Sequence, residues 1–166
     1  MRINVYNTLL DDDRKPMLVK ESSNNFPAVS QIKAPQDLVK ILNGVFNANN
    51  QTEEHVWLIA LNSANAIIGI FELSHGSINS SIMSTREIFM KLCLCGAANF
   101  MLAHNHPSGE TTPSKPDLEV TETICKAGKM MQIELLDHVI IGRDNYDFYS
   151  FQQYGIIKNW EINNLN

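Results

Sequence analysis

The chain has 166 residues, of which 44% are hydrophobic, and a formal net charge of −5. This length and composition fit one globular domain with a sizeable core rather than a disordered chain. The acidic balance and the lack of a lysine or arginine run argue against unaided nucleic-acid binding, and no apolar run reaches the roughly 18 residues of a membrane span.

The cysteines and the N-terminus bear on the compartment. Three cysteines, an odd number without framework spacing, favour a reducing environment. Residues 1–5 lack the charged-then-apolar pattern of a signal peptide, so we expect a cytoplasmic protein. Cys93 and Cys95 lie in a helical pattern, where side chains two residues apart diverge. We interpret them as small buried residues rather than a metal-binding pair.

The N-terminal part of the chain contains two short apolar segments, 2–9 and 16–20, separated by a charged turn. This pattern predicts a hairpin, and the polar residues 21–33 predict a loop. Apolar residues spaced three and four positions apart then predict an amphipathic helix over 35–47, with a proline in its first turn.

The middle of the chain alternates apolar runs with turn signals. The runs 56–61 and 66–73, joined by a four-residue polar turn, predict an antiparallel hairpin. Residues 75–81 form a polar, glycine-containing loop, and a capping-box pattern begins a helix predicted over 85–97. The short apolar run 100–103 predicts a buried strand.

The last third continues the alternation of helix and strand. The sequence predicts a helix over 115–130, strands at 133–141 and 146–151, and a frayed tail over 158–166. Helices that interleave with partly hairpin-linked strands indicate an α/β domain, in which helices pack on a mixed sheet.

Two histidines follow the predicted strand 100–103 and form an H-x-H pair, His104 and His106. On an extended chain these side chains point the same way. Asp117 arrives as the next helix begins, so two imidazoles and one carboxylate can hold a zinc ion whose fourth position is left for water. Two plainer interpretations stay open: the histidines are ordinary loop residues, or Ser114 and Asp117 form only a capping box.

The complete spacing, H-x-H, seven residues, serine, two residues, aspartate, with a glutamate upstream, resembles the JAMM motif of the JAB/MPN+ metalloprotease superfamily. Further segments are similar to its RadC branch, and the resemblance covers roughly residues 35–157. These segments are His104–Gly109, Pro113–Ser114, Leu136–Gly142, Gly76–Asn79 and Arg86–Ile88.

The resemblance implies a three-layer α/β/α sandwich with a mixed sheet, the cytidine-deaminase-like JAB/MPN fold. It divides the chain into N-terminal strands and a loop (1–34), a RadC-like JAB/MPN domain (35–157) and a tail (158–166). No helix-hairpin-helix segment, which longer RadC proteins carry, is recognisable in residues 1–34.

The resemblance also implies an activity and its residues: a zinc-dependent peptidase or isopeptidase with one Zn²⁺ per chain held by His104, His106 and Asp117. By register with the RadC pattern, Glu54 matches the glutamate that activates the zinc-bound water, with Glu53 as the near alternative. Ser114 matches the serine that polarises the scissile carbonyl.

The pair Asp137–His138 is left open between a structural hydrogen-bonded pair and a group that supports the metal site. Because the two side chains face opposite sides of a strand, at most one of them looks toward the metal.

Other classes of protein fit the sequence less well. The letters His104-Asn105-His106 spell HNH, but HNH nucleases spread those residues over a larger unit. Zinc deaminases need a later P-C-x-x-C pair, which this chain lacks. A DNA-repair or mobile-element-associated RadC role and a non-catalytic MPN interaction module remain the alternatives. We expect a peptide or protein substrate, and the sequence leaves the oligomeric state open.

Overall fold

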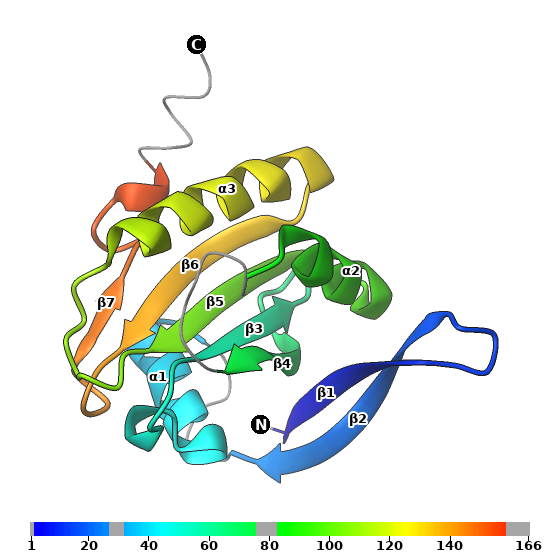
Figure 1. Cartoon of the computed structure of the whole chain (residues 1–166), viewed down its shortest axis with the longest axis horizontal. Coiled ribbons are helices and arrows are strands. Elements are labelled where there is room, and N and C mark those ends of the chain that lie inside the picture. Colours follow the sequence, from blue (N-terminus) through cyan, green and yellow to red (C-terminus); the bar gives the residue numbers. More distant parts are fainter. Residues whose placement is uncertain (1, 27–31, 76–82, 159–166) are drawn as a thin grey trace.

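The computed structural model describes residues 2–26, 32–75 and 83–158. Its centre is a seven-stranded mixed sheet with the strand order β2-β1-β4-β3-β5-β6-β7 (Figure 1). The pairs β1–β4 and β5–β6 are parallel and the other pairs are antiparallel. None of the helices in these ranges is long and apolar enough to span a membrane. The predicted loop 75–81 lies almost wholly outside the described residues.

The elements follow the predicted order, with shifts of a few residues at their ends. Their bounds are β1 Arg2–Leu10, β2 Pro16–Asn25, α1 Pro35–Phe46, a 3₁₀ turn η1 Ala48–Asn50, β3 His55–Leu61, β4 Ile67–His75, α2 Thr85–Cys95, β5 Asn99–Asn105, α3 Lys115–Met131, β6 Glu134–Ile141 and β7 Phe148–Ser150.

Two hydrophobic layers hold the helices on opposite faces of the sheet (Figure 1). On one face α1 packs through Leu38 and Leu42 against Trp57 of β3. On the other face α2 and α3 pack through Leu92 and Ile124, respectively, against the remaining core. This arrangement confirms the three-layer α/β/α sandwich of the JAB/MPN type.

Strand β3 shows why the sheet lies between two layers. Val56, Leu58 and Ala60 belong to the core under α2 and α3, whereas Trp57 and Ile59 belong to the core under α1. Successive side chains of a strand point to opposite faces, so an unbroken apolar run needs cover on both sides. Each large side chain fully buried here contributes about 1.5–3 kcal/mol.

The N-terminal hairpin is present and joins the main sheet, because Val5 of β1 pairs in parallel with Ile70 of β4. Residues 21–25 were predicted as a loop, and this prediction is wrong: they extend β2. A polar sequence forms a strand here because β2 is at the edge of the sheet, where Ser23 Oγ donates to Asn4 Oδ1 at 2.8 Å and accepts from Arg2 Nε at 2.6 Å.

Two helix ends differ from the sequence pattern for local reasons. Helix α2 ends at Cys95 rather than residue 97, because Gly96 adopts φ 65° and its N–H bonds to the carbonyl of Cys93. Cys95 is partly buried, but Cys93 is exposed, so its interpretation as a buried residue is wrong. Position 93 falls on the helix face that turns away from Ile88 and Leu92.

The predicted strand 146–151 is also shorter than expected. The carboxylate of Asp144 accepts hydrogen bonds from the backbone N–H groups of Tyr146 and Asp147 at 2.7 and 3.0 Å. These bonds continue the turn through residue 147, and β7 therefore begins at Phe148.

Candidate metal centre

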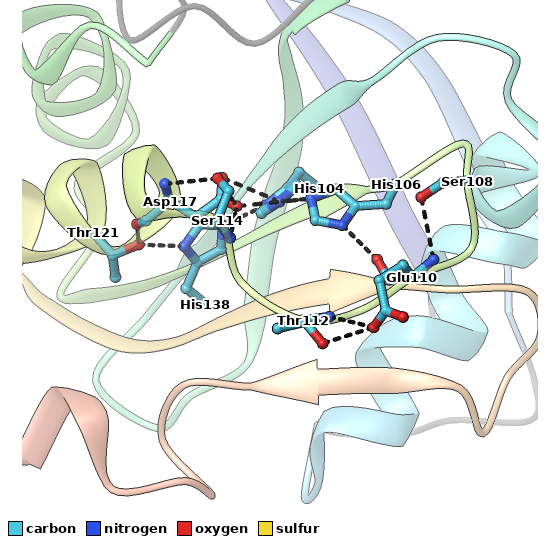
Figure 2. Close-up of polar contacts among 9 residues, drawn as sticks. All are labelled: His104, His106, Ser108, Glu110, Thr112, Ser114, Asp117, Thr121 and His138. Carbon is cyan, nitrogen blue, oxygen red and sulfur yellow. Dashed lines mark hydrogen bonds and ion pairs between the residues drawn. The ribbon is translucent and has the colours of Figure 1, made fainter.

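The candidate site forms where the carboxyl end of β5 meets the amino end of α3. His104 lies within β5, on the same face as Phe100 and Leu102, and His106 follows the strand directly. Asp117 occupies the first turn of α3. Figure 2 shows the two imidazoles and the carboxylate turned toward one another. These three predicted ligands are therefore brought together.

The distances among the three side chains suit one small metal ion. His104 Nε2 lies 3.1 Å from His106 Nε2 and 3.5 Å from Asp117 Oδ1, and His106 Nε2 lies 3.7 Å from Asp117 Oδ2. Ligands placed tetrahedrally at zinc distances are about 3.3–3.4 Å from one another. The separations of His104 Nε2 from His106 Nε2 and from Asp117 Oδ1 bracket this value, and the group can hold a metal ion.

The hydrogen bonds of the Asp117 carboxylate involve one of its oxygens and leave the other available to a metal ion. Asp117 Oδ2 accepts hydrogen bonds from the backbone N and the Oγ of Ser114 at 2.8 and 2.6 Å. Asp117 Oδ1 is buried and has no hydrogen-bond partner among the described residues. An unsatisfied buried acceptor costs free energy, and an ion between Oδ1 and the imidazoles removes that cost.

Ser114 and Asp117 also form the predicted capping box, since Asp117 N donates back to Ser114 Oγ at 3.3 Å. The cap and the metal site are thus compatible. The box fixes the carboxylate at the entrance of α3 and directs its second oxygen toward the imidazoles.

Electrostatics in the site favour an ionised carboxylate. Burial alone raises the pKa of Asp117, but the hydrogen bond with His106, the charge of His104 and the bonds from Ser114 outweigh it and hold the pKa well below its usual range. The hydrogen bond with Asp117 raises the pKa of His106, and the Glu54 carboxylate adds to this effect. A proton and a metal ion therefore compete for the same point.

Glu54 is the better placed of the two candidate bases. Val56 pairs with His104 across β3 and β5, so alternation brings Glu54, two residues earlier, to the face that carries the histidines. Glu54 is partly buried, and its charge acts on His106. Glu53 is exposed, and the same alternation places it on the face opposite to the histidines.

Asn105, between the two histidines, holds the segment that carries Glu54. Its Oδ1 accepts from His55 N at 2.8 Å, and its Nδ2 donates to the carbonyl of Glu53 at 3.0 Å. One amide side chain thus fixes the backbone on both sides of Glu54. The H-N-H order therefore serves two faces of β5: the histidines face the ion site and the asparagine anchors the start of β3.

The pair Asp137–His138 divides between the faces of β6. His138 Nε2 lies 2.8 Å from His104 Nδ1, so His138 is the member that contacts a candidate metal ligand. Asp137 accepts hydrogen bonds from Ser150 Oγ and Gln152 N at 2.6 and 3.0 Å, which is a structural role. Of the two options left open for this pair, contact with the candidate metal ligands applies to His138, and a structural hydrogen-bonded role applies to Asp137.

Thr121 and Glu110 were not singled out by the sequence analysis as site residues. Thr121 Oγ1 contacts His138 Nδ1 at 2.7 Å, and the Glu110 carbonyl accepts from His106 Nδ1 at 2.5 Å. Thr121 lies one helical turn after Asp117 on a mostly apolar face of α3, and a polar residue at such a position is the signal that points to it. The contact of Glu110 is made by its backbone carbonyl, which every residue has, so no residue type in the sequence indicates it.

Asp137 gives the folded protein a testable dependence on pH. Burial raises its pKa to about 6, against the lowering effect of its hydrogen bonds with Ser150 and Gln152. The unfolded pKa is about 3.9, so between about pH 4 and pH 6 the native protein binds more protons than the unfolded chain. Stability contributed by this group is therefore lost as the pH rises, by about 2–3 kcal/mol in total.

Urea unfolding of the unchanged protein and Asp137→Asn, from about pH 4 to pH 7, measures this effect as the difference between the two profiles. Burial lowers the pKa of His138 to about 4 and acts in the opposite direction, but it is common to both proteins. Asp12→Asn, in the exposed hairpin turn, controls for the loss of a carboxylate. Parallel profiles for Asp137→Asn and the unchanged protein would contradict the prediction.

The fold and the His-His-Asp group define a JAB-type domain, and comparison with known sequences agrees. A family model described as "RadC-like JAB domain" matches residues 32–156, and the chain belongs to this family. It is 39% identical over 127 residues to a UPF0758 protein of Clostridium beijerinckii. It is 40% identical over 127 residues to one of Clostridium botulinum and 35% identical over 127 residues to one of Chlorobaculum parvum.

These alignments cover 76% of this chain but 54–55% of each relative. The chain thus spans about half the length of the curated relatives it matches. What the alignments establish is the shared JAB domain; activity and substrates are matters for a proposal.

Proposed function

We propose that the protein is a zinc-dependent metallohydrolase of the JAMM type, acting as a peptidase or isopeptidase. The observation that carries the proposal is the meeting of three potential ligand atoms: the Nε2 atoms of His104 and His106, and Asp117 Oδ1, which accepts no hydrogen bond from the described residues. Two imidazoles and one carboxylate are a ligand set of catalytic zinc sites, which keep a fourth position open.

Zinc held there supplies a Lewis acid and brings the pKa of a water molecule in its open position to about 7. Glu54, on the same side of β3 as the histidines, takes the proton of the attacking water and delivers it to the leaving amine. A positioned glutamate suits this role because its side chain can act first as the general base and then as the general acid.

Ser114 is the proposed donor to the oxyanion. Its one hydroxyl proton is donated to Asp117 Oδ2 in the structure, so donation to a substrate oxygen requires the hydroxyl to turn. The backbone N–H of Ser114 also binds Oδ2 and keeps the carboxylate in place while the hydroxyl moves.

The alternative functions receive less support. A non-catalytic interaction module has no need for three converging ligands and an adjacent glutamate. A direct DNA-repair role needs phosphate contacts, and the net charge of −5 does not favour them. The cytoplasm remains our proposal for the compartment, since all three cysteines are free.

Hydrolysis by metal-stripped and zinc-reloaded protein tests the proposal. A quenched-fluorescence peptide library and a set of isopeptide-linked lysine substrates are the probes. We expect cleavage that is absent after chelation and returns with about one zinc per chain, as one three-ligand site requires. Zinc bound in that ratio without cleavage of any probe contradicts the peptidase assignment and favours the interaction module.

A further inference from the structure

Behind the candidate metal ligands, a row of hydrogen bonds runs from α3 across β6 to β5 (Figure 2). Its first member is the hydroxyl of Thr121, which lies 2.5 Å from the backbone carbonyl of Asp117 and 2.7 Å from His138 Nδ1. A carbonyl oxygen accepts hydrogen bonds and never donates them. The single hydroxyl proton therefore goes to the carbonyl, and Thr121 Oγ1 accepts from His138 Nδ1–H.

The next two bonds follow from the first. A neutral imidazole carries one N–H group, so His138 Nε2 has a lone pair. The contact of 2.8 Å between His138 Nε2 and His104 Nδ1 then needs its proton from His104. His104 in turn carries its hydrogen on Nδ1 and presents a lone pair at Nε2, the atom that faces His106 and Asp117.

An independent contact places a hydrogen of His106 on Nδ1. Its Nδ1 lies 2.5 Å from the carbonyl of Glu110, which again can only accept. When both imidazoles are neutral, two backbone carbonyls, one in α3 and one in the loop before it, thus leave both Nε2 atoms with lone pairs that face one point. Thr121, His138 and His104 can each donate or accept a hydrogen bond. Only the carbonyl of Asp117 at the end of the row determines which of them donates in each bond.

We propose that Thr121 and His138 are positioning residues, which fix His104 in the Nδ1–H tautomer and so prepare the metal centre before an ion enters. His104, Thr121 and His138 are each fully buried, so water does not replace a missing member of the row. The ring of His138 is held further by stacking on Phe151, with centroids 4.9 Å apart and planes 15° apart. This inference rests on the metal site of the proposed function, and not on the hydrolysis.

Helix α3 offers a matched pair of substitutions. Thr121 and Thr123 each bond through Oγ1 to the carbonyl four residues earlier, but Thr123 is exposed and lies away from His138. Thr121→Val keeps the shape of the side chain and removes the hydroxyl, so His138 Nδ1–H loses its acceptor. Thr123→Val makes the same chemical change outside the row, and Thr121→Ser restores the hydroxyl.

The first readout is the tautomer of His104 in the metal-free chain of 166 residues, from long-range ¹H–¹⁵N NMR spectra of the imidazole rings. We expect the proton on Nδ1 in the unchanged protein, in Thr121→Ser and in Thr123→Val, and a mixture of tautomers in Thr121→Val. A proton on Nε2 of His104 in the unchanged protein overturns the proposal. This readout requires no metal, so it stands or falls separately from the proposed function.

The second readout is zinc affinity, from competition with a chromogenic chelator. We expect Thr121→Val to bind zinc roughly 10- to 100-fold more weakly, the usual effect of losing a partner of a ligand imidazole, and the two other variants to match the unchanged protein. Equal affinity for Thr121→Val and Thr123→Val overturns the proposal. If Thr121→Val does not fold, the NMR spectra of the unchanged protein and Thr121→Ser decide it. Failure of the unchanged protein to bind zinc contradicts the proposed function instead.

Discussion

We expect Glu54→Gln to keep bound zinc and to lower the rate of the proposed peptide hydrolysis by roughly 10²- to 10⁴-fold, the range that general acid–base catalysis contributes. The amide has nearly the same size as the carboxylate but cannot accept a proton from water. Because Glu54 is not among the three ligand residues, metal content and hydrolysis separate in this variant. Zinc analysis and kcat/KM on the same preparation measure both.

Glu53→Gln is the matched control, one residue away. Glu53 is exposed, and its position in the chain alternation turns it from the histidine face, so we expect its kcat/KM and zinc content to equal those of the unchanged protein. If instead Glu53→Gln abolishes hydrolysis and Glu54→Gln does not, Glu53 is the base. The strand alternation that begins at the pairing of Val56 with His104 then does not continue to residue 54.

We expect His104→Ala and His106→Ala each to bind no zinc, because two remaining ligands do not hold the ion. His104 is fully buried and its removal also opens a cavity. The His106 side chain is 13% exposed, so His106→Ala separates loss of metal from loss of packing. Zinc per chain, measured after dialysis against metal-free buffer, is the readout.

We also expect zinc to change the thermal unfolding of the unchanged protein and of His106→Ala differently. An ion that binds the folded state stabilises it by RT ln(1 + [L]/Kd), about 2.7 kcal/mol when free zinc is 100 times Kd. We therefore expect zinc to raise the Tm of the unchanged protein. The Tm of His106→Ala should be the same with and without zinc. His55→Ala is the control, since His55 bonds to Glu72 at 2.5 Å, outside the ligand group. An equal rise in Tm for His106→Ala would place the zinc elsewhere.

Much of the site could be predicted from the sequence because its signals are local. His104 and His106 share a side by the two-residue period of a strand, and Ser114 and Asp117 lie three residues apart at a helix start. Each of these relations depends on a few neighbouring backbone angles. The helix over 35–47 and the buried strands were predictable for the same reason.

The relations between distant segments could not be predicted in this way. The register of β3 against β5 sets Val56 opposite His104, and a slip of one residue would turn Glu53 toward the ion site in place of Glu54. The resemblance to a known family suggested Glu54, but the register of β3 against β5 cannot be derived from spacing along the chain. The role of His138 likewise depends on the parallel pairing of β6 with β5.

The sequence by itself determined the order of the elements and the short-range ligand motif, since these follow from periodicity and capping within single segments. The tertiary structure decided which glutamate lies on the side of the histidines, that Thr121 and His138 form a row of hydrogen bonds behind His104, and that the N-terminal hairpin extends the main sheet. The physical reason is that pairing between strands is fixed by packing on both faces of the sheet at once, which no single segment specifies.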